Sequence, residues 1–467
     1  MKQILTLIAV LSFGVLSGQW VKTYGGSELD EATSVQQTSD GGYIIAGTTK
    51  SYGAGDKDFY LIKTNENGDT TWTKTYGGAE TDECQSVKQT TDGGYIIAGT
   101  TNSFVAGDKD YYLIKTNENG DTIWSKTFDN SKYDNAFSTL QTTDGGFVIV
   151  GYTQQTGNSS YDVYLIKTDA SGDTIWTKTY GGTQSEFPHY VNQTSDGGYI
   201  ITGSTFSNTL GSQDVYLVKT DEYGDTLWTK AYGGTGSDVA EHVQQTPDGG
   251  YIIAGYTESF GTGSYDAYLL KTDSLGDTTW TKTYGGVDFD KATSVQQTTD
   301  GGYIIAGMTK SYGAGNMDVY VIKTNENGDT LWTKTYGGNN YDLASYLKQT
   351  SDGGYVIAGL TASFGNGNYD FYLIKTDING DTIQTQNSIN DIKGIKDMYP
   401  NPFTTYTTIE LPLEPHILTI YDIVGNKVRE EQVLGTTVIE RGGLTKGIYI
   451  IKAKSETQTL KGKVLVE

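Results

Sequence analysis

The stretch SVQQTSDGGYIIAGTT, residues 34–49, decides the fold of this chain, because close copies of it return at a fixed interval. The next copy, SVKQTTDGGYIIAGTT, spans residues 86–101, and five more follow at the same spacing of 52 residues. Such self-similarity is the sequence signature of a repeat architecture. A tryptophan also recurs at the same spacing of 52 residues: Trp20, Trp72, Trp124, Trp176, Trp228, Trp280 and Trp332.

Each unit divides into four short runs of β-branched and aromatic residues, separated by turn signals. Gly41 in the first turn and Gly68 in the last supply the positive φ that tight turns need. In the first unit the runs cover residues 34–38, 43–49, 59–64 and 70–76. The chain is therefore predicted to be all-β and to contain seven four-stranded units.

Two arrangements can bury the faces of these units: a closed β-propeller or an open solenoid. An open array needs end repeats with a polar outer face, and none of the seven units diverges in that way. The chain also starts partway through a unit: a tryptophan-bearing strand (residues 20–24) precedes the first unit. The seventh unit, in turn, has Gln384 where its tryptophan would stand. We therefore expect a seven-bladed β-propeller in which the N-terminal strand completes the last blade.

Several residues are expected to hold the blades together. The seven tryptophans are predicted to wedge between blades rather than to stack on a cofactor. Cys84 is predicted to be a buried small residue, because the other units have alanine or proline there, and a lone cysteine can form no internal disulfide. One glutamine of the first strand is favoured as a bridge between blades over a channel-lining role. These glutamines are Gln37, Gln89, Gln141, Gln193, Gln245, Gln297 and Gln349.

The charge of the chain is distributed unevenly. The net charge is −23; residues 391–467 contain ten basic and ten acidic residues, so the segment before them has 23 basic against 46 acidic residues. An acidic body repels phosphate backbones and anionic bilayers. Nucleic acid is therefore not expected as a partner, whereas divalent cations or cationic surfaces are better tolerated.

The first 18 residues have the pattern of a secretory signal peptide. Met1-Lys2-Gln3 is a short basic start, residues 4–16 are apolar, and small residues follow at Ser17 and Gly18. The apolar run is too short to span a bilayer, and no later segment is long and apolar enough. Cleavage is expected near residues 18 and 19, and no transmembrane segment is expected.

The repeat resembles a known family of bacterial β-propeller repeats, often written GGxxxD…DxxGNxYVxGxT. The matching residues run from Tyr24-Gly25-Gly26 through Asp30 to DGGYIIAG at residues 40–47. The hairpin of residues 60–72 is similar to the tryptophan-docking hairpins of quinoprotein-like propellers. It departs from the sialidase Asp-box by one extra residue between glycine and tryptophan. The resemblance covers residues 19 to about 388, and it implies the fold but no particular activity.

Residues 398–467 break the period and contain three ordered motifs: MYPNPF at 398–403, TIYDIVGNKV at 419–428 and LTKGIYI at 444–450. The alternating apolar runs predict a small β-sandwich. The segment closely resembles the C-terminal (type A) sorting domain of cargo exported by the type IX secretion system of Bacteroidota. The resemblance implies type IX machinery as a partner, export across the outer membrane, and then release or attachment at the cell surface.

These observations divide the chain into four expected segments. They are a signal peptide at residues 1–18, the propeller at 19–388, a linker at 389–397 and the sorting domain at 398–467. The mature protein is predicted to be secreted or held at the outer-membrane cell surface.

Two sets of acidic residues recur in every unit. The first set lies between the outermost strand of one blade and the innermost strand of the next: Asp30, Asp82, Asp134, Glu186, Asp238, Asp290 and Asp342. The second set opens the third strand: Asp58, Asp110, Asp162, Asp214, Asp266, Asp318 and Asp370. Because both loop types leave the same face of a propeller, two rings of carboxylates are expected at one mouth. They could bind Ca²⁺ or a polyhydroxylated or basic ligand, but presence in every unit favours a loop-shaping role, since one site needs asymmetry.

Other candidate binding residues lie in loops. The loop before the third strand has an aromatic residue in five units, which either binds sugars or protein chains or anchors the loop: Tyr52, Phe104, Phe260, Tyr312 and Phe364. Blades three and four deviate most, at residues 154–160 and 206–213, so a specialised pocket is expected there. His189 and His242 lie one register position apart on adjacent innermost strands, so strand alternation predicts opposite faces and no shared metal site.

The sequence contains no Ser–His–Asp arrangement, Cys–His pair or phosphate-binding motif that would indicate catalysis. The favoured hypothesis is a secreted or cell-surface binding module without enzymatic activity, which holds a glycan or a protein at its loop-rich acidic face. One alternative is a propeller hydrolase or lyase that acts on polysaccharide through acidic residues of blades three and four. A structural role in matrix or adhesion is the other. No cofactor is expected, with Ca²⁺ as the one candidate ion.

Overall fold

The computed structural model describes residues 19–104, 109–130, 133–154, 160–207, 209, 211–382, 398–399, 402–411, 413, 415–422, 426–455 and 459–466. The predicted signal peptide, the predicted linker and Gln384 therefore lie outside the described residues. Within them every regular element is a β-strand, as the sequence predicts. The chain divides into two compact units, Met1–Ile383 and Gln384–Glu467.

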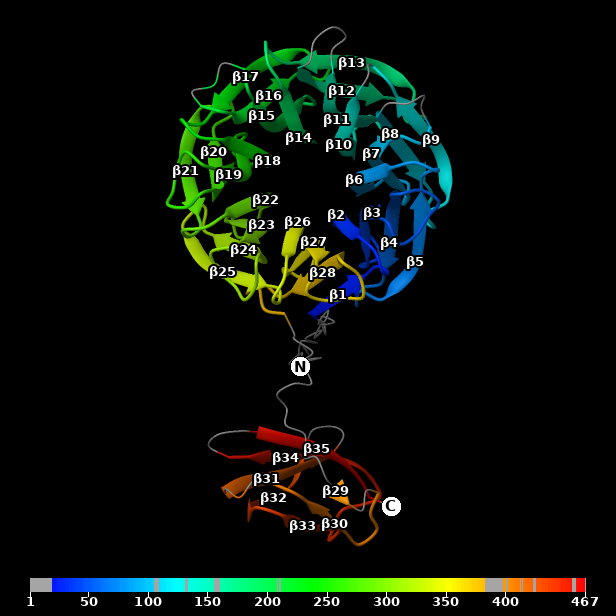
Figure 1. Ribbon diagram of the computed structural model, residues 1–467, viewed down its shortest axis with the longest axis vertical. Coiled ribbons are helices and arrows are strands. Elements are labelled where there is room, and N and C mark those ends of the chain that lie inside the picture. The colour runs from blue at the N-terminus through cyan, green and yellow to red at the C-terminus, as the bar shows by residue number, and fades with distance from the viewer. Residues whose placement is uncertain are drawn as a thin grey trace, which may run out of the picture. The chain divides into compact units, whose positions relative to one another are not determined.

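The first unit is a propeller of seven four-stranded sheets around a central axis (Figure 1). Blade 1 contains β2 (Asp30–Gln37), β3 (Tyr43–Thr49), β4 (Asp58–Thr64) and β5 (Thr70–Tyr76). Blade 2 contains β6 (Asp82–Gln89), β7 (Tyr95–Thr101), β8 (Asp110–Thr116) and β9 (Thr122–Phe128). Blade 3 contains β10 (Asp134–Gln141), β11 (Phe147–Gln154), β12 (Tyr161–Thr168) and β13 (Thr174–Tyr180).

The remaining blades repeat this order. Blade 4 contains β14 (Glu186–Gln193), β15 (Tyr199–Thr205), β16 (Asp214–Thr220) and β17 (Thr226–Tyr232). Blade 5 contains β18 (Asp238–Gln245), β19 (Tyr251–Thr257), β20 (Asp266–Thr272) and β21 (Thr278–Tyr284). Blade 6 contains β22 (Asp290–Gln297), β23 (Tyr303–Thr309), β24 (Asp318–Thr324) and β25 (Thr330–Tyr336). Blade 7 contains β26 (Asp342–Gln349), β27 (Tyr355–Thr361), β28 (Asp370–Thr376) and β1 (Trp20–Tyr24).

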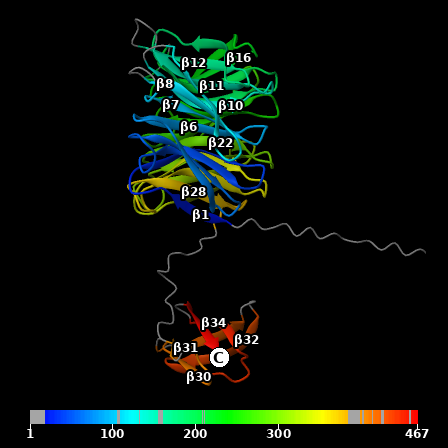
Figure 2. The same ribbon diagram turned by 90° about the vertical axis from the view of Figure 1, so that its right-hand side faces the viewer.

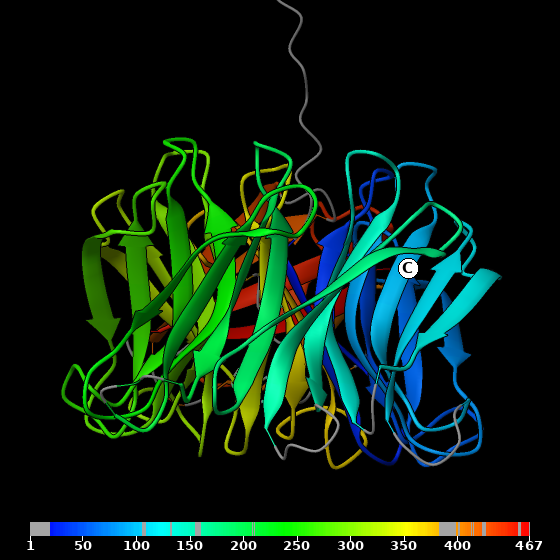
Figure 3. The same ribbon diagram turned by 90° about the horizontal axis from the view of Figure 1, so that it is seen from above.

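The strands run between two faces of the propeller that hold the loops (Figures 2 and 3). We call the face with the β3–β4 and β5–β6 loops and their equivalents the loop face. The opposite face holds the tight hairpin turns, where Gly41 has a φ of 85°. The innermost strand of each blade starts at the loop face and lies beside the axis (Figure 1).

The ring is closed by the N-terminal strand, as predicted. β1 pairs antiparallel with β28, and Trp20 lies opposite Lys375. The amide of Asp30 in blade 1 donates to the carbonyl of Tyr369 in blade 7 at 2.8 Å. Side chains from both blades also share one core cluster, which includes Val35 and Phe371. The first and last blades are therefore joined by the same kind of packing that joins their neighbours.

The hydrophobic core lies between the blades. Ile44 and Phe59 of blade 1 pack in one cluster with Cys84 and Tyr95 of blade 2, and equivalent clusters join the other neighbours. The thiol of Cys84 is fully buried, as predicted. Each blade therefore depends on its neighbours, because a single sheet has no partner for either of its faces.

Two predicted bridges between blades are confirmed. Trp20 of blade 7 packs edge-on against Tyr43 of blade 1, with ring centroids 5.5 Å apart, and its indole N–H donates to the Glu66 carbonyl at 3.1 Å. The Gln37 side chain accepts a hydrogen bond from the Ser351 amide of blade 7 at 2.9 Å, and five further glutamines of this row make the same contact. Gln297 has no such partner amide, because Pro247 occupies that position in blade 5.

A β-bulge interrupts every innermost strand at the same place. In β2 the register shifts between Ala32 and Ser34, so Thr33 has no partner residue in β3. The same shift recurs in the six other blades. A bulge inserts one extra residue and redirects the side chains around it. This local irregularity decides what faces the propeller axis.

The second unit forms two small sheets (Figures 1 and 2). One contains β29 (Met398–Tyr399), β30 (Tyr406–Ile409) and β33 (Thr437–Glu440); the other contains β32 (Lys427–Leu434), β31 (Pro415–Asp422), β34 (Gly447–Lys454) and β35 (Thr459–Val466). Ile409 and Ile439 of the first sheet share a buried cluster with Leu418 and Ile451 of the second. The unit is therefore a sandwich with its core between the sheets, as predicted.

Candidate ligand-binding site

The first ring of acidic residues is buried within the loop face. Asp238 is inaccessible to solvent, and its carboxylate accepts hydrogen bonds from the Gly234 amide at 2.9 Å, from the Ser259 hydroxyl at 2.5 Å and from the Thr257 hydroxyl. All seven members are at most 1 % exposed. The structure therefore corrects the expected acidic mouth, because these carboxylates are buried and bind groups of their own loops.

The second ring has the same role. The carboxylate of Asp266 accepts hydrogen bonds from the amides of Thr262 and Gly263 at 2.8 and 3.0 Å, and Asp58 accepts one from Gly55 at 3.0 Å. Burial raises the pKa of Asp58, although the backbone hydrogen bonds offset part of that effect. Both rings thus match the loop-shaping alternative.

The five predicted loop aromatics are half exposed. Each is between 43 % and 50 % exposed and packs on a tyrosine of the third strand of its blade. The Phe104 ring lies 5.1 Å from the Tyr112 ring, and the Tyr52 hydroxyl donates to the Gly25 carbonyl at 2.8 Å. These side chains anchor their loops and still present an aromatic surface, so their part in ligand binding stays a prediction.

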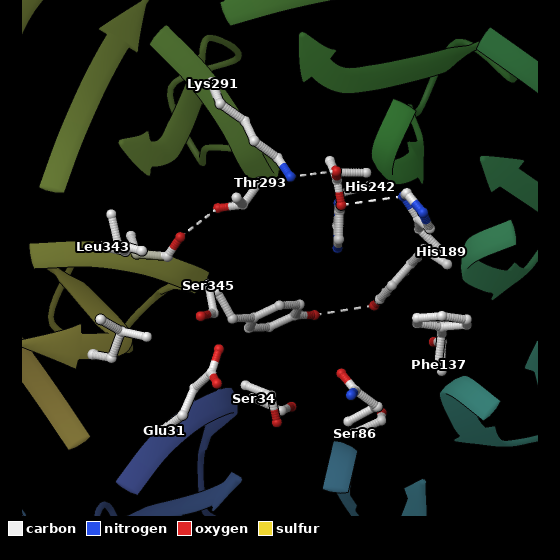
Figure 4. A pocket seen from close by; sticks show the side chains of 18 of the residues that line it. Glu31, Ser34, Ser86, Phe137, His189, His242, Lys291, Thr293, Leu343 and Ser345 are labelled. Carbon is white, nitrogen blue, oxygen red and sulfur yellow. Dashed lines mark hydrogen bonds and ion pairs between the residues drawn. The ribbon is translucent and has the colours of Figure 1, made fainter. Parts of the chain in front are cut away.

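The propeller axis holds a cavity of about 510 Å³, which we call the axial cavity (Figure 4). Its wall comes mainly from the middle of the innermost strands, with Lys88 further along β6, and from the ends of second strands near the loop face. His189 is a bulge residue and His242 directly follows one, yet both line this cavity. Our expectation of opposite faces for these histidines was therefore wrong, because the bulge breaks the alternation on which it relied.

The residues at and after the bulge differ from blade to blade. The bulge residues are Thr33, Gln85, Phe137, His189, Glu241, Thr293 and Ser345. The residues that follow them are Ser34, Ser86, Ser138, Tyr190, His242, Ser294 and Tyr346. Blades 4, 5 and 7 thus bring large titratable or aromatic groups to the axis, whereas the other blades bring a small serine after the bulge. The cavity wall is chemically asymmetric.

One carboxylate in the wall binds two basic groups. Glu241 lies 3.1 Å from His189 Nδ1 and 2.6 Å from Lys291 Nζ (Figure 4). Burial raises the pKa of Glu241, but the attraction of His189 and Lys291 outweighs it and holds that pKa well below its usual range. Glu241 therefore stays ionised, and three consecutive blades are linked around it.

A second network crosses the channel. The Lys88 ammonium of blade 2 donates to the Tyr346 hydroxyl of blade 7 at 3.0 Å, and the hydroxyls of Tyr346 and Tyr190 lie 3.0 Å apart. Burial raises the pKa of both phenols to about 12, so both stay neutral. His242 lies against Tyr190, with ring centroids 4.0 Å apart. Blades 2, 4, 5 and 7 therefore meet at the axis.

The loop-face edge of the cavity has a charged side. Glu83 accepts hydrogen bonds from Lys57 and Lys109, which come from the second-to-third-strand loops of blades 1 and 2. Glu31 of blade 1 lines the cavity nearby. Burial and the neighbouring Glu83 raise the pKa of Glu31, although Lys57 opposes them.

Aromatic residues replace part of this charged set in blades 3 and 4: Tyr161 stands where blade 1 has Lys57, and Phe187 stands where blade 1 has Glu31. Tyr152, Tyr161 and Phe187 lie within 4.9–5.6 Å of one another, ring centroid to ring centroid, and are partly exposed. We call these three residues the aromatic cluster. The Tyr152 ring lies 5.8 Å from Phe137, which lines the axial cavity. This aromatic surface lies next to the cavity but outside the loops at 154–160 and 206–213, where a specialised pocket was expected. Residues 155–159, 208 and 210 of those loops lie outside the described residues, so that expectation stays a prediction.

Three carboxylates of the described residues have the spacing of a metal site. Oxygens of Asp110, Asp129 and Asp134 all lie within 4.8 Å of one another. Carboxylate oxygens are ligands that suit Ca²⁺. Asp129 stands where the other units have glycine: Gly25, Gly77, Gly181, Gly233, Gly285 and Gly337. This group is the place in the described structure where the candidate Ca²⁺ could bind, and its binding stays a prediction.

Sequence reasoning missed the axial cavity residues other than the histidines. It weighed residues that recur in every copy, whereas the cavity is built from two positions that vary between copies. Those positions lie between the invariant acid of each innermost strand and its invariant glutamine. A comparison of the seven copies position by position would have found them, but only the bulge shows that both face the axis.

Comparison with protein families concerns the second unit. Residues 397–467 match the family described as "Secretion system C-terminal sorting domain". The C-terminal unit is a sorting domain of the type IX secretion system. The sorting domain indicates export to the cell surface or beyond and implies interaction with the secretion machinery. Among the described residues no helix could span a membrane.

The propeller has more distant likenesses. The regulatory protein FlaEY of Caulobacter vibrioides is 24 % identical over 287 residues, which cover 52 % of this chain and 30 % of that protein. The chain thus spans less than a third of the length of this curated relative.

Solved structures are similar in fold alone. The puromycin hydrolase S511A mutant matches with a TM-score of 0.50 and 12 % identity over 83 % of this chain and 59 % of that one. PorZ, a surface component of the type IX secretion system of Porphyromonas gingivalis, matches with a TM-score of 0.44 and 10 % identity over 95 % of this chain and 60 % of PorZ. The Neurospora crassa Pan2 WD40 domain matches with a TM-score of 0.47 and 11 % identity over 74 % and 89 %.

Proposed function

We propose that this chain is a type IX secretion cargo that acts outside the cell as a glycan-binding protein without catalytic activity. Its ligand site is the axial cavity together with the aromatic cluster. The observation that supports this proposal is the break in sevenfold symmetry at the axis: an acid occupies the loop position in all blades, whereas the residues of the cavity wall and its edge vary between blades.

The chemistry of the site suits a sugar. The apolar C–H face of a sugar ring packs on aromatic rings such as Tyr152 and Phe187, which are partly exposed at the cavity edge. Its hydroxyl groups can exchange hydrogen bonds with the serine and threonine side chains of the wall. A volume of about 510 Å³ falls within the range of small-ligand pockets.

The test is a glycan array probed with the full mature chain and with the variant Tyr152→Thr. Threonine is the residue that blades 1 and 2 have at this position, Thr48 and Thr100, so the variant is compatible with the fold. Loss of the aromatic ring should weaken binding of the selected glycan about two- to tenfold, because such contacts contribute about 0.5–1.5 kcal/mol.

The matched control is Phe364→Ala, which removes an exposed aromatic of the loop face away from the cluster. This control should bind like the parent protein. If Phe364→Ala loses binding while Tyr152→Thr keeps it, the ligand sits on the loop aromatics and the proposed site is wrong. If no glycan binds, the glycan proposal itself fails.

A further inference from the structure

Two lysines stand at an axial position where other blades have glutamine. The equivalent residues in the seven blades are Gln36, Lys88, Leu140, Asn192, Gln244, Gln296 and Lys348. The side-chain oxygen of Gln36 accepts a hydrogen bond from the backbone amide of Gln89 at 2.9 Å. The side chain of Gln296 accepts one from the backbone amide of Gln349 at 2.8 Å. A lysine has no acceptor. Blades 2 and 7 therefore replace a bridge between blades with a cation.

Both cations lie against the same aromatic ring. Lys88 Nζ is 4.5 Å and Lys348 Nζ is 5.6 Å from the centroid of Tyr346. Within the described part of the chain no carboxylate oxygen lies within 4 Å of either ammonium group. Most other described lysines of the propeller are paired with an acid, so this pair is unusual in a protein with a net charge of −23.

The proximity of the Lys88 and Lys348 side chains is electrostatically unfavourable when no anion lies between them. Burial lowers the pKa of Lys88, and the like charge of Lys348 lowers it further, although Tyr190 opposes both effects. Two ammonium groups in a partly desolvated site repel each other, because the local dielectric constant is lower than that of water. An anion between them would relieve this repulsion.

His242 provides a second, independent sign of a missing ligand. It is only 3 % exposed, it lines the axial cavity, and neither of its ring nitrogens has a hydrogen-bond partner. Burial and the two lysines hold its pKa well below the usual value, so the ring is neutral and has one N–H to donate. A buried polar group without a partner is rare in proteins and calls for an explanation.

The carboxylates of the cavity do not satisfy these groups. Glu241 is already bound by His189 and Lys291. Glu31 is the other acid of the wall, and it interacts with Lys57 rather than with Lys88. Lys88 lines the cavity and Lys348 lies beside the same Tyr346 ring, so within the described residues no carboxylate neutralises the positive charge at this part of the wall.

We propose that Lys88, Lys348 and His242 form an anion subsite that takes an acidic substituent of the glycan, either a carboxylate or a sulfate ester. This inference rests on the proposed function in that it names the class of sugar held by the same cavity. The two ammonium groups neutralise the substituent, and the His242 N–H donates to one of its oxygens. The ligand is thus an acidic glycan rather than a neutral one.

The experiment measures binding of two matched pairs of oligomers to the full mature chain by calorimetric titration. One pair is a galacturonic acid trimer and its methyl ester; the other is a sulfated galactan oligomer and its desulfated form. The acidic member of at least one pair should bind at least about tenfold more tightly than its neutral partner, and the pair that shows this preference identifies the substituent.

The variants Lys88→Gln and Lys348→Gln introduce the residue that three other blades have at this position. Each should reduce the preference for the acidic oligomer about tenfold, because each weakens binding of the acidic oligomer more than binding of its neutral partner. Lys310→Gln makes the same charge change at an exposed site on the loop face and should keep the preference.

Three results would overturn the subsite. Equal affinity for acidic and neutral oligomers would disprove it while the proposed glycan binding stands. If Lys310→Gln reduces the preference for acidic oligomers as much as Lys88→Gln does, the preference comes from the electrostatic field of the whole protein and not from this subsite. Absence of binding of all four oligomers would also reject it, whichever glycan the array selects.

Discussion

The acid ring and the bulge positions lie on the same seven innermost strands, only three residues apart, yet they have opposite characters. The ring has a carboxylate in every blade, and each is buried within the loop face. The bulge positions have threonine, glutamine, phenylalanine, histidine, glutamate, threonine and serine in the seven blades, and they face the shared axis.

This difference shows how a repeat protein acquires a single site. Every blade packs between two similar neighbours, so the residues that make these contacts are the same in each copy. The axis is the one place where all seven blades meet, and a difference between copies there makes a shape and charge distribution that occur once. In this chain recurrence therefore indicates a structural role, and divergence at the axis indicates a functional one.

The largest effect should come from opening the ring. Deletion of Trp20–Tyr24 leaves the edge of β28 without its partner strand and exposes the core cluster shared by blades 7 and 1. Truncation of a buried tryptophan alone costs about 3–5 kcal/mol, so the deletion should cost at least that much. Thermal unfolding monitored by circular dichroism should show a large fall in Tm or aggregation. A near-native Tm would mean that β1 does not hold the ring.

A smaller loss is expected within the acid ring. Asp238→Asn replaces an acceptor of three hydrogen bonds by an amide that must place its NH₂ group among donors. The free energy of unfolding should fall by about 2–3 kcal/mol in urea titration, since hydrogen bonds to charged groups are worth about 1.5–3 kcal/mol. Asp288→Asn, in an exposed loop, is the control and should change little. Weaker glycan binding by the folded Asp238→Asn protein would show that the acid ring also takes part in binding.

The stability of the propeller should depend on pH through His242. Its pKa is lowered in the folded protein, so below about pH 6.5 the unfolded chain binds a proton that the folded chain rejects. Stability should therefore fall by up to about 1.4 kcal/mol per pH unit as the pH falls below that value. His242→Ser introduces the serine that four other blades have here, and it should remove this component. Urea midpoints of both proteins at neutral and acidic pH measure it, and parallel pH profiles would contradict it.

The smallest effect is expected at the outer edge of the ring. Lys22 contacts Asp69 of the next blade at 3.0 Å, and the same ion pair recurs around the propeller in solvent. Exposed pairs contribute little, because water and salt screen them. Lys22→Gln should leave the Tm unchanged within error, at low and at high salt. A clear loss of stability would show that recurrent exposed pairs also hold the blades.

Much of the fold could be predicted from the sequence because several independent signals in the repeat indicate the same structure. The seven tryptophans, the glycine turns and the tryptophan-bearing strand before the first unit each predict the closed ring, and the structure confirms it. The interpretation of the glutamine row as bridges is also confirmed, since side chains such as that of Gln37 accept a hydrogen bond from a backbone amide of the neighbouring blade.

The site was harder to predict, for a physical reason. A strand pattern assigns side chains to faces by strict alternation, and one bulge residue such as Thr33 or His189 reverses the assignment without any sign in the sequence. The contacts across the axis, such as that between Lys88 and Tyr346, join residues 258 positions apart. Local patterns contain no information about such pairs.

A crystal structure of the mature chain with the glycan selected by the array would locate the ligand directly. Electron density is expected in the axial cavity, with a sugar ring against Tyr152 or Phe187 and an acidic group near Lys88. Density over the loop aromatics Phe104 or Phe364, with the axial cavity empty of sugar, would contradict this expectation.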